Sequence, residues 1–98
     1  MSHWIHPGAE AELGDAAAYD AEHASRLVAE AFLVEYERVR DLLAESQQRG
    51  PHADFGLRIC HFDRFPFWIL CEESEERGPQ IDAVAHPRRE PGYWATRL

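Results

Sequence analysis

The sequence predicts an α+β domain in which an antiparallel helical hairpin packs on a small antiparallel sheet. Up to about residue 49, apolar residues recur every three or four positions, which is typical of amphipathic helices. From residue 55 onward the pattern changes to the two-residue alternation of strands. With 98 residues and an apolar fraction of 45%, the chain has the size and composition of one domain over residues 1–98.

The N-terminal segment predicts a short strand and then a first helix. Residues 2–5 are apolar at Trp4 and Ile5 and favour a strand. Pro7 marks the helix start, because the missing N–H of proline costs nothing at the first helical position. A helix over residues 8–20 follows, and its inner side consists mainly of small residues: Ala9, Leu13, Ala16, Ala17 and Tyr19.

The second helix is the clearest element of the sequence. We expect it over about residues 22–49, after a short break near Asp20–Ser25. Arg49-Gly50-Pro51 ends it, with Gly50 available for a left-handed cap. The short break makes the two helices an antiparallel hairpin. The inner face repeats at three- and four-residue spacing: Val28, Phe32, Leu33, Tyr36, Val39, Leu42 and Leu43.

The C-terminal half predicts an antiparallel meander and a short final helix. The strands are expected over residues 55–62, 66–72 and 80–86. Short polar connections join them, which indicates an antiparallel meander. The strand over 66–72 should be central, since it is apolar on both sides. In the last strand, simple alternation places Ile81, Ala83 and Ala85 on one side. A short helix over residues 93–98 completes the predicted order of strand, two helices, three strands and tail.

The chain offers few groups for cofactor or metal chemistry. Cys60 and Cys71 lie inside apolar runs, so we interpret them as core thiols, and two cysteines are too few for a disulfide framework. His3 and His6 have a spacing seen in metal sites, but no cysteine or carboxylate of fitting spacing accompanies them. The sequence contains no glycine-rich phosphate loop or nucleophile elbow. We therefore expect no cofactor, no metal and no catalytic residue.

The charge balance is strongly acidic. There are 18 acidic residues against 10 arginines and no lysine, which gives a formal charge of −8. Direct nucleic-acid binding is not expected, because phosphate neutralisation drives it. The C-terminal end differs in charge, because residues 86–98 contain three arginines (Arg88, Arg89 and Arg97) and one acid, Glu90. A surface that binds anions should therefore lie there. The sequence has neither an apolar run of membrane-spanning length nor the pattern of a signal peptide, so we expect a cytoplasmic protein without membrane contact.

Two sequence motifs stand out in the C-terminal third. Arg64-Phe65-Pro66-Phe67 opens one predicted strand, and Ala83–Trp94 contains the next strand and the turn after it. Within the second motif, the strand ends in His86, and then follow Arg89, the acidic-proline pair Glu90-Pro91 and Trp94. This pattern resembles the RelE/ParE superfamily of type II toxins, and more specifically its ParE branch. The element order predicted above also resembles the family fold over nearly the whole chain.

The resemblance implies one half of a toxin–antitoxin pair. ParE toxins are described as poisoning DNA gyrase, and RelE relatives as cleaving mRNA on the ribosome. Both are neutralised by a cognate antitoxin, here ParD-like, whose C-terminal segment wraps the toxin in a hetero-oligomer. On this interpretation the chain binds and inhibits DNA gyrase without a catalytic site. Two departures matter: toxins of this superfamily are often basic, and this chain has none of the lysines that RelE-type enzymes use on RNA.

Seven residues are candidates for contact with the target. Arginine offers a planar fork for carboxylate or phosphate, and Trp, Tyr and Arg dominate interface energies. The candidates are Arg64, His86, Arg88, Arg89, Tyr93, Trp94 and Arg97. Structural roles are the alternative: His86 and Arg89 would fix the tail to the sheet, with Arg89 pairing to Glu90 or to a helix acid. Trp94 would then cover the sheet edge.

Two other functions remain open from the sequence. A ribonuclease needs a base, an acid and a cationic stabiliser, and His61, His86, Arg64, Arg89 and Tyr93 supply these residue types. The absence of lysine and the net negative charge count against it. The other is a ParE-fold binding module that has lost toxicity. For the antitoxin, we expect a mainly apolar interface in which arginines supply local pairs.

Overall fold

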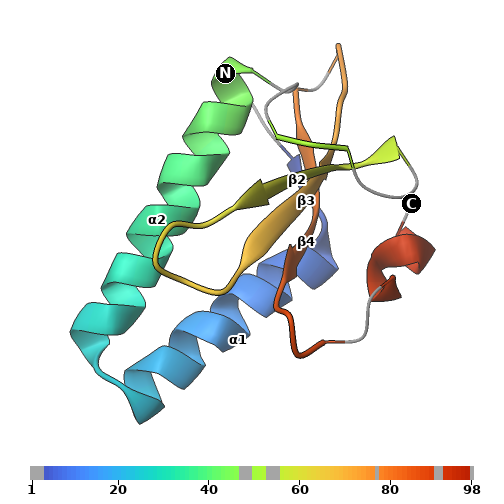
Figure 1. Cartoon of the computed structure of the whole chain (residues 1–98). Helices are drawn as coiled ribbons and strands as arrows, with labels where there is room; N and C mark the ends of the chain where they lie inside the picture. Colours follow the sequence, from blue (N-terminus) through green and yellow to red (C-terminus); the bar gives the residue numbers. More distant parts are fainter. Residues whose placement is uncertain (1–3, 47–49, 53–55, 77, 90–91, 98) are drawn as a thin grey trace.

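Two helices and a four-stranded sheet make up the fold (Figure 1). The structure is a computed structural model that describes residues 4–46, 50–52, 56–76, 78–89 and 92–97. In chain order the elements are β1 (Trp4–Ile5), α1 (Pro7–His23), α2 (Arg26–Glu45), β2 (Arg58–His61), β3 (Trp68–Glu72), β4 (Gln80–Ala85) and the 3-10 helix η2 (Tyr93–Arg97). The predicted α+β class and element order are confirmed. Among the described residues, no helix is long and apolar enough to span a membrane.

The strands lie in the order β1-β4-β3-β2, so β3 is a central strand, as predicted. β2, β3 and β4 form the expected antiparallel meander. β1 instead runs parallel to β4, with Trp4 beside Gln80 and Ile5 beside Ile81. The sheet is therefore mixed, which corrects the expectation of a wholly antiparallel one. Alternation reveals which face a residue takes and nothing about the direction of a distant partner strand.

A β-bulge in β4 corrects the predicted side-chain pattern. Leu70 pairs with Ala83 and Cys71 pairs with Ile81, so Asp82 has no partner on β3. The extra residue shifts the alternation by one position. As a result Ile81 and Ala83 pack on opposite faces of the sheet, in different core clusters, whereas simple alternation places them on the same face.

The helix ends differ from the predicted ones by a few residues. His6 caps α1 by accepting the Gly8 N–H at 2.9 Å, and α1 continues to His23, past the predicted end. α2 ends at Glu45, where Ser46 is the C-cap with an extended backbone, and residues 47–49 lie outside the described part. Gly50 is not its cap: it has a positive φ of 86° and lies against Ile59, whose carbonyl oxygen would clash with a Cβ at that position.

Two apolar clusters pack on opposite faces of the sheet. The larger one lies under the helices and centres on the fully buried Phe32, whose ring meets those of Phe62, Phe65 and Phe67 at 5.5, 5.5 and 4.9 Å. The smaller one lies on the other face and consists of Leu57, Leu70, Ala83 and Ala85, with η2 packed over it. Both cysteines are buried core thiols, as predicted, and burial raises the pKa of Cys71 to about 12. Tyr19, expected on the inner side of α1, is 61% exposed.

The strands are shorter than predicted, because the ends of the apolar runs form turns. β3 begins at Trp68, two residues after Pro66, since proline cannot donate to a sheet ladder. β2 covers Arg58–His61 of the strand predicted over 55–62, and Phe55 lies outside the described part. β4 ends one residue before its predicted end. η2 is described as far as Arg97, and Leu98, the last residue of the predicted helix, also lies outside the described part.

Candidate functional site

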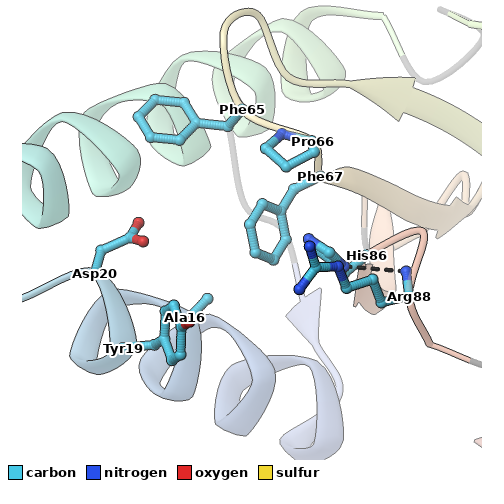
Figure 2. A pocket seen from close by; sticks show the side chains of 8 residues that line it. All are labelled: Ala16, Tyr19, Asp20, Phe65, Pro66, Phe67, His86 and Arg88. Atoms are coloured by element: carbon cyan, nitrogen blue, oxygen red, sulfur yellow. Dashed lines mark hydrogen bonds between the residues drawn. The ribbon is translucent and has the colours of Figure 1, made fainter. Parts of the chain in front are cut away.

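Three adjoining hollows follow one side of the molecule along α1 and the β2–β3 connection. The central hollow, of about 500 Å³, is lined by Ala16, Tyr19, Asp20, Phe65, Pro66, Phe67, His86 and Arg88 (Figure 2). The α2 hollow, of about 440 Å³, is lined by Ala31, Val34, Glu35, Asp63, Arg64 and Phe65. The tail hollow, of about 150 Å³, is lined by Glu12, Asp15, Phe67, Val84, His86, Arg89 and Tyr93. Phe65 lines both the α2 and the central hollow, and Phe67 and His86 line both the central and the tail hollow, so the three hollows adjoin. We call the three together the groove.

The central hollow has an apolar floor between two polar walls. Figure 2 shows Phe67 standing in the middle, with Tyr19 and Asp20 of α1 on one side and His86 and Arg88 on the other. Asp20 and Arg88 place opposite charges on the two walls of the hollow. The arrangement suits an occupant that carries an apolar group beside a carboxylate.

His86 holds the backbone that carries Arg88. Its ring packs edge-on against Phe67, with the centroids 4.9 Å apart, and its Nδ1 accepts the backbone N–H of Arg88 at 3.1 Å. Because Nδ1 accepts, the neutral ring carries its proton on Nε2. The short turn after β4 is closed by a second bond, from the Arg89 N–H to the His86 carbonyl at 3.0 Å. His86 therefore makes local hydrogen bonds within the turn after β4, and it lines both the central and the tail hollow.

Arg64 and Arg88 differ from the other arginines. Of the eight arginines that the structure describes, six form an ion pair with a carboxylate: Arg26, Arg38, Arg40, Arg58, Arg89 and Arg97. Within the described residues, Arg64 and Arg88 have no such partner, and both are exposed. One lines the α2 hollow and the other lines the central hollow. The two described arginines without an ion-pair partner therefore both lie at the groove.

The Glu12 carboxylate joins the C-terminal tail to α1 and β4. It accepts from Arg97 at 2.9 Å, from Arg89 at 3.0 Å and from the backbone N–H of Val84 at 3.1 Å. β1 ends at Ile5, so the Val84 N–H lies on the edge of β4 beyond β1, and Glu12 satisfies it. Arg97 also donates to the Asp82 carbonyl on this edge at 2.9 Å. We call these contacts the Glu12 clamp.

The tail residues make the intramolecular contacts of the structural alternative. Arg89 pairs with a helix acid, which is the structural alternative, and this acid is Glu12; Glu90 lies outside the described residues. The Arg89 guanidinium lies over the Tyr93 ring, 3.9 Å from its centroid. Tyr93 and Trp94 pack on the smaller core cluster, as expected for a cover of the sheet. Burial, and then the Glu12 carboxylate, raise the pKa of Tyr93.

A second polar cluster fixes the connection before β3. The buried Glu35 carboxylate accepts the backbone N–H of Asp63 and two bonds from Arg38, at 2.6 and 2.8 Å. Arg38 also reaches Asp63 at 3.1 Å. The hydrogen bond from Arg38 holds the pKa of Glu35 below its usual range. The next residue, Arg64, has a φ of 66° and is the only non-glycine residue with positive φ in the described part of the chain.

The seven predicted contact residues take different positions. Arg64, His86 and Arg88 line the α2 and central hollows. Arg89 and Tyr93 line the tail hollow and also belong to the tail, whereas Trp94 and Arg97 belong to the tail and its clamp. Sequence reasoning did not single out Glu12 or Glu35 for these roles. The signal for Glu12 is weak, because it is one of five acids on α1 and the sequence does not show which of them contacts distant arginines.

The two histidines of the ribonuclease hypothesis lie on different faces. The His61 ring contacts Trp68, which packs on the smaller cluster, and the His86 ring contacts Phe67, which packs on the larger cluster. These clusters occupy opposite faces of the sheet, as Ile69 and Leu70 of β3 alternate between them. The pair therefore does not form a joint acid and base site in this structure.

Comparison with known proteins reveals a likeness of fold. No protein-family model matches the sequence, and no curated protein matches it. A solved structure titled "Chromosomal ParDE TA system from P. aeruginosa" contains a chain that superposes with a TM-score of 0.74. The match covers 88% of this chain and 95% of that chain at 21% sequence identity. The predicted ParE-like resemblance is confirmed as a shared fold.

Proposed function

We propose that this protein is the toxin component of a type II toxin–antitoxin system of the ParDE kind. The observation that carries the proposal is the fold match to a chain of a ParDE system, at a TM-score of 0.74 over nearly the whole length of both chains. The sequence motif from His86 to Trp94 supports the same assignment. A fold hosts many functions, so the site must supply the mechanism.

The proposed mode of action is stoichiometric binding, with DNA gyrase in the cytoplasm as the target. The groove with its two unpaired arginines is suited to holding acidic and apolar groups of another protein. We assign Arg64, His86 and Arg88 to the contact surface and give the Glu12 clamp the task of holding the tail in place. The proposed neutralising partner is a ParD-like antitoxin that forms a hetero-oligomer with the toxin.

Catalytic RNA cleavage is the weaker candidate. General acid–base cleavage needs both proton-transfer groups within reach of one phosphodiester. His61 and His86 lie on opposite faces of the sheet, and Glu12 neutralises Arg89. The net charge of −8 also opposes the approach of RNA.

Controlled expression in bacterial cells tests the proposal. Induction should arrest growth, co-expression of the cognate antitoxin should restore it, and the purified protein should inhibit gyrase supercoiling at a fixed stoichiometry. Arrest with cleaved transcripts and normal supercoiling would favour the ribonuclease. Normal growth in the absence of any antitoxin would favour the non-toxic binding module and would reject the toxin assignment.

A further inference from the structure

Asp82 is a buried carboxyl group of β4 to which no described residue donates a hydrogen bond. Its side chain is 1% exposed, and neither carboxylate oxygen has a hydrogen-bond partner in the described part of the chain. It is also the extra residue of the β-bulge, so no residue of β3 lies opposite it. Burial of an ionised carboxylate without donors is strongly unfavourable, whereas a neutral carboxylic acid is buried at a much lower cost. The position therefore favours the protonated form of Asp82.

Glu72 supplies the acceptor that a protonated Asp82 needs. It lies on β3 and pairs with Gln80, two positions before Asp82 on β4. Burial, and then a hydrogen bond with the Glu72 carboxyl group, raise the pKa of Asp82 from 3.8 to about 8. A hydrogen bond between two carboxyl groups requires one proton, because an ionised carboxylate can only accept. The two groups therefore carry one negative charge at neutral pH, and the more exposed Glu72 holds it.

Charged and titratable groups from β3, η2 and α1 surround this pair. Cys71 of β3 stays a neutral thiol, because burial raises its pKa to about 12. Arg97 of η2 is a cation close to Asp82, and its charge favours the ionised carboxylate. Its guanidinium nevertheless donates to the Glu12 carboxylate of α1 at 2.9 Å and to the backbone carbonyl of Asp82 at 2.9 Å. Arg97 thus contacts the backbone of Asp82 and leaves its carboxyl group unpaired, which agrees with a neutral side chain.

Loss of the proton changes the balance between the two carboxyl groups that Arg97 can reach. An ionised Asp82 is buried next to the charge of Glu72, so it needs a donor and a countercharge. Arg97 is in place to supply both, because it already donates to the Asp82 carbonyl. Its two terminal nitrogens now bind Glu12, at 2.9 and 3.3 Å. A guanidinium that turns toward the Asp82 carboxylate is drawn away from these bonds.

We propose that Asp82 and Glu72 share one proton in the folded protein, and that loss of this proton transfers Arg97 from Glu12 to Asp82 and so opens the Glu12 clamp at the last turn of the chain. Arg89 stays with Glu12, so the opening is confined to η2. The device is a pH switch in the contact between the tail and the sheet, and it does not depend on the toxin assignment.

Carbon-13 NMR of the full-length protein tests the shared proton. The Asp82 carboxyl carbon should titrate with a midpoint near pH 8, and the Glu72 carboxyl carbon should shift in the same step, because strongly interacting groups titrate together. E72Q removes the neighbouring charge and should lower the Asp82 midpoint. The control E75Q removes the same charge from an exposed position of the β3–β4 connection and should leave the midpoint unchanged. An Asp82 midpoint near its ordinary value of 3.8 would overturn the proposal.

A double-mutant cycle between Glu12 and Arg97 tests the transfer. E12Q, R97Q and their combination are unfolded with urea at about pH 6 and about pH 9, on either side of the Asp82 titration. The coupling should be of order tenfold in the unfolding constant at the lower pH, and it should approach onefold at the higher pH. In the D82N background the coupling should be the same at both pH values. Equal coupling in the wild type at both values, or an equal loss in D82N, would overturn the transfer.

The Glu12 carboxyl carbon gives a second measurement that needs no change in the clamp. In the wild type its resonance should shift together with that of Asp82, because Glu12 loses the Arg97 guanidinium in the same step. In D82N the resonance should stay constant over this range. A Glu12 resonance that does not respond to the Asp82 titration would show that Arg97 keeps its partner, and it would overturn the switch while leaving the toxin assignment untouched.

Discussion

The Arg97 guanidinium donates to the Glu12 carboxylate at 2.9 Å, although 85 positions separate the two residues. Both side chains are largely withdrawn from solvent, with exposed fractions of 14% and 10%. The contact ties the last turn of the chain to its first helix and, through the Val84 N–H, to the open edge of β4. A domain of this size has a small hydrophobic core, so a single buried contact contributes much to holding the tail in place.

Removal of the Glu12 carboxylate should therefore destabilise the whole domain. Glu12→Ala leaves Arg97 and Arg89 without their partner and leaves the Val84 N–H unsatisfied. Loss of one member of a mostly buried pair typically costs about 3 kcal/mol. Urea unfolding monitored by circular dichroism measures the change. Glu22→Ala, at an exposed position of the same helix, should stay within about 0.5 kcal/mol of the wild type. A small effect for both variants would contradict the role given to the clamp.

Two glycines of α1 should respond in opposite ways to alanine. Nothing lies within 4 Å of a Cβ at Gly14, so Gly14→Ala gains helix propensity and should stabilise the protein by about 0.5–1 kcal/mol. At Gly8, a Cβ would lie 2.7 Å from the Arg97 Cζ, so Arg97 must move out of the clamp. We expect Gly8→Ala to be neutral or destabilising in thermal unfolding. Equal stabilisation by both substitutions would show that the guanidinium does not lie on Gly8.

Local sequence patterns predict only the features that neighbouring residues determine. The contacts of Glu12 with Arg97 and Val84 join residues that are far apart in the sequence, so such patterns do not predict them. The period of α2 predicts a core face, and Phe32, Tyr36, Val39 and Leu43 of that face are buried. Val28 and Leu33, predicted on the same face, are instead 38% and 37% exposed. The meander follows from short polar connections in the same way.

The remaining features depend on pairs that are distant in the sequence. The parallel pairing of β1 with β4 and the bulge at Asp82 require the strand partners to be known. The Glu12 clamp and the bond from Asp63 to Glu35 join helix acids to groups that the period of a helix does not identify. At the groove, the residue types predicted Arg64, His86 and Arg88 as candidates for target contact. Arg89 and Arg97 were candidates on the same grounds, and only the structure shows that both pair with Glu12.

Substitution of Arg64 should separate stability from binding. Asn tolerates the left-handed conformation better than Arg does, so Arg64→Asn should raise the free energy of unfolding by about 0.5 kcal/mol. The same substitution removes a charge from the groove, so we expect weaker growth arrest on induction of a better-folded protein. Chemical denaturation and growth curves of one variant measure both effects. Arg88 does not have a positive φ, so Arg88→Asn should weaken the growth arrest without raising the free energy of unfolding. A destabilised Arg64→Asn protein would argue that Arg64 has a structural role.

The buried carboxyl of Asp82 should make stability depend on pH in an unusual direction. Asp82 is 1% exposed, and neither of its carboxylate oxygens has a hydrogen-bond partner within the described structure. Burial, and then the Glu72 carboxylate, raise its pKa from 3.8 to about 8, whereas Arg97 acts in the opposite sense.

Because the folded state holds this proton more tightly than the unfolded state, the stabilisation is complete below about pH 4. It then declines as the pH rises toward 8 and is lost above that value. Asp82→Asn has no proton to lose, so its stability relative to the wild type should increase between pH 5 and 8 by at least about 2 kcal/mol. Urea unfolding at a series of pH values measures this difference, and Glu72→Gln should reduce the slope without abolishing it. Parallel pH profiles for the wild type and Asp82→Asn would show that Asp82 is ionised in the folded protein throughout this range.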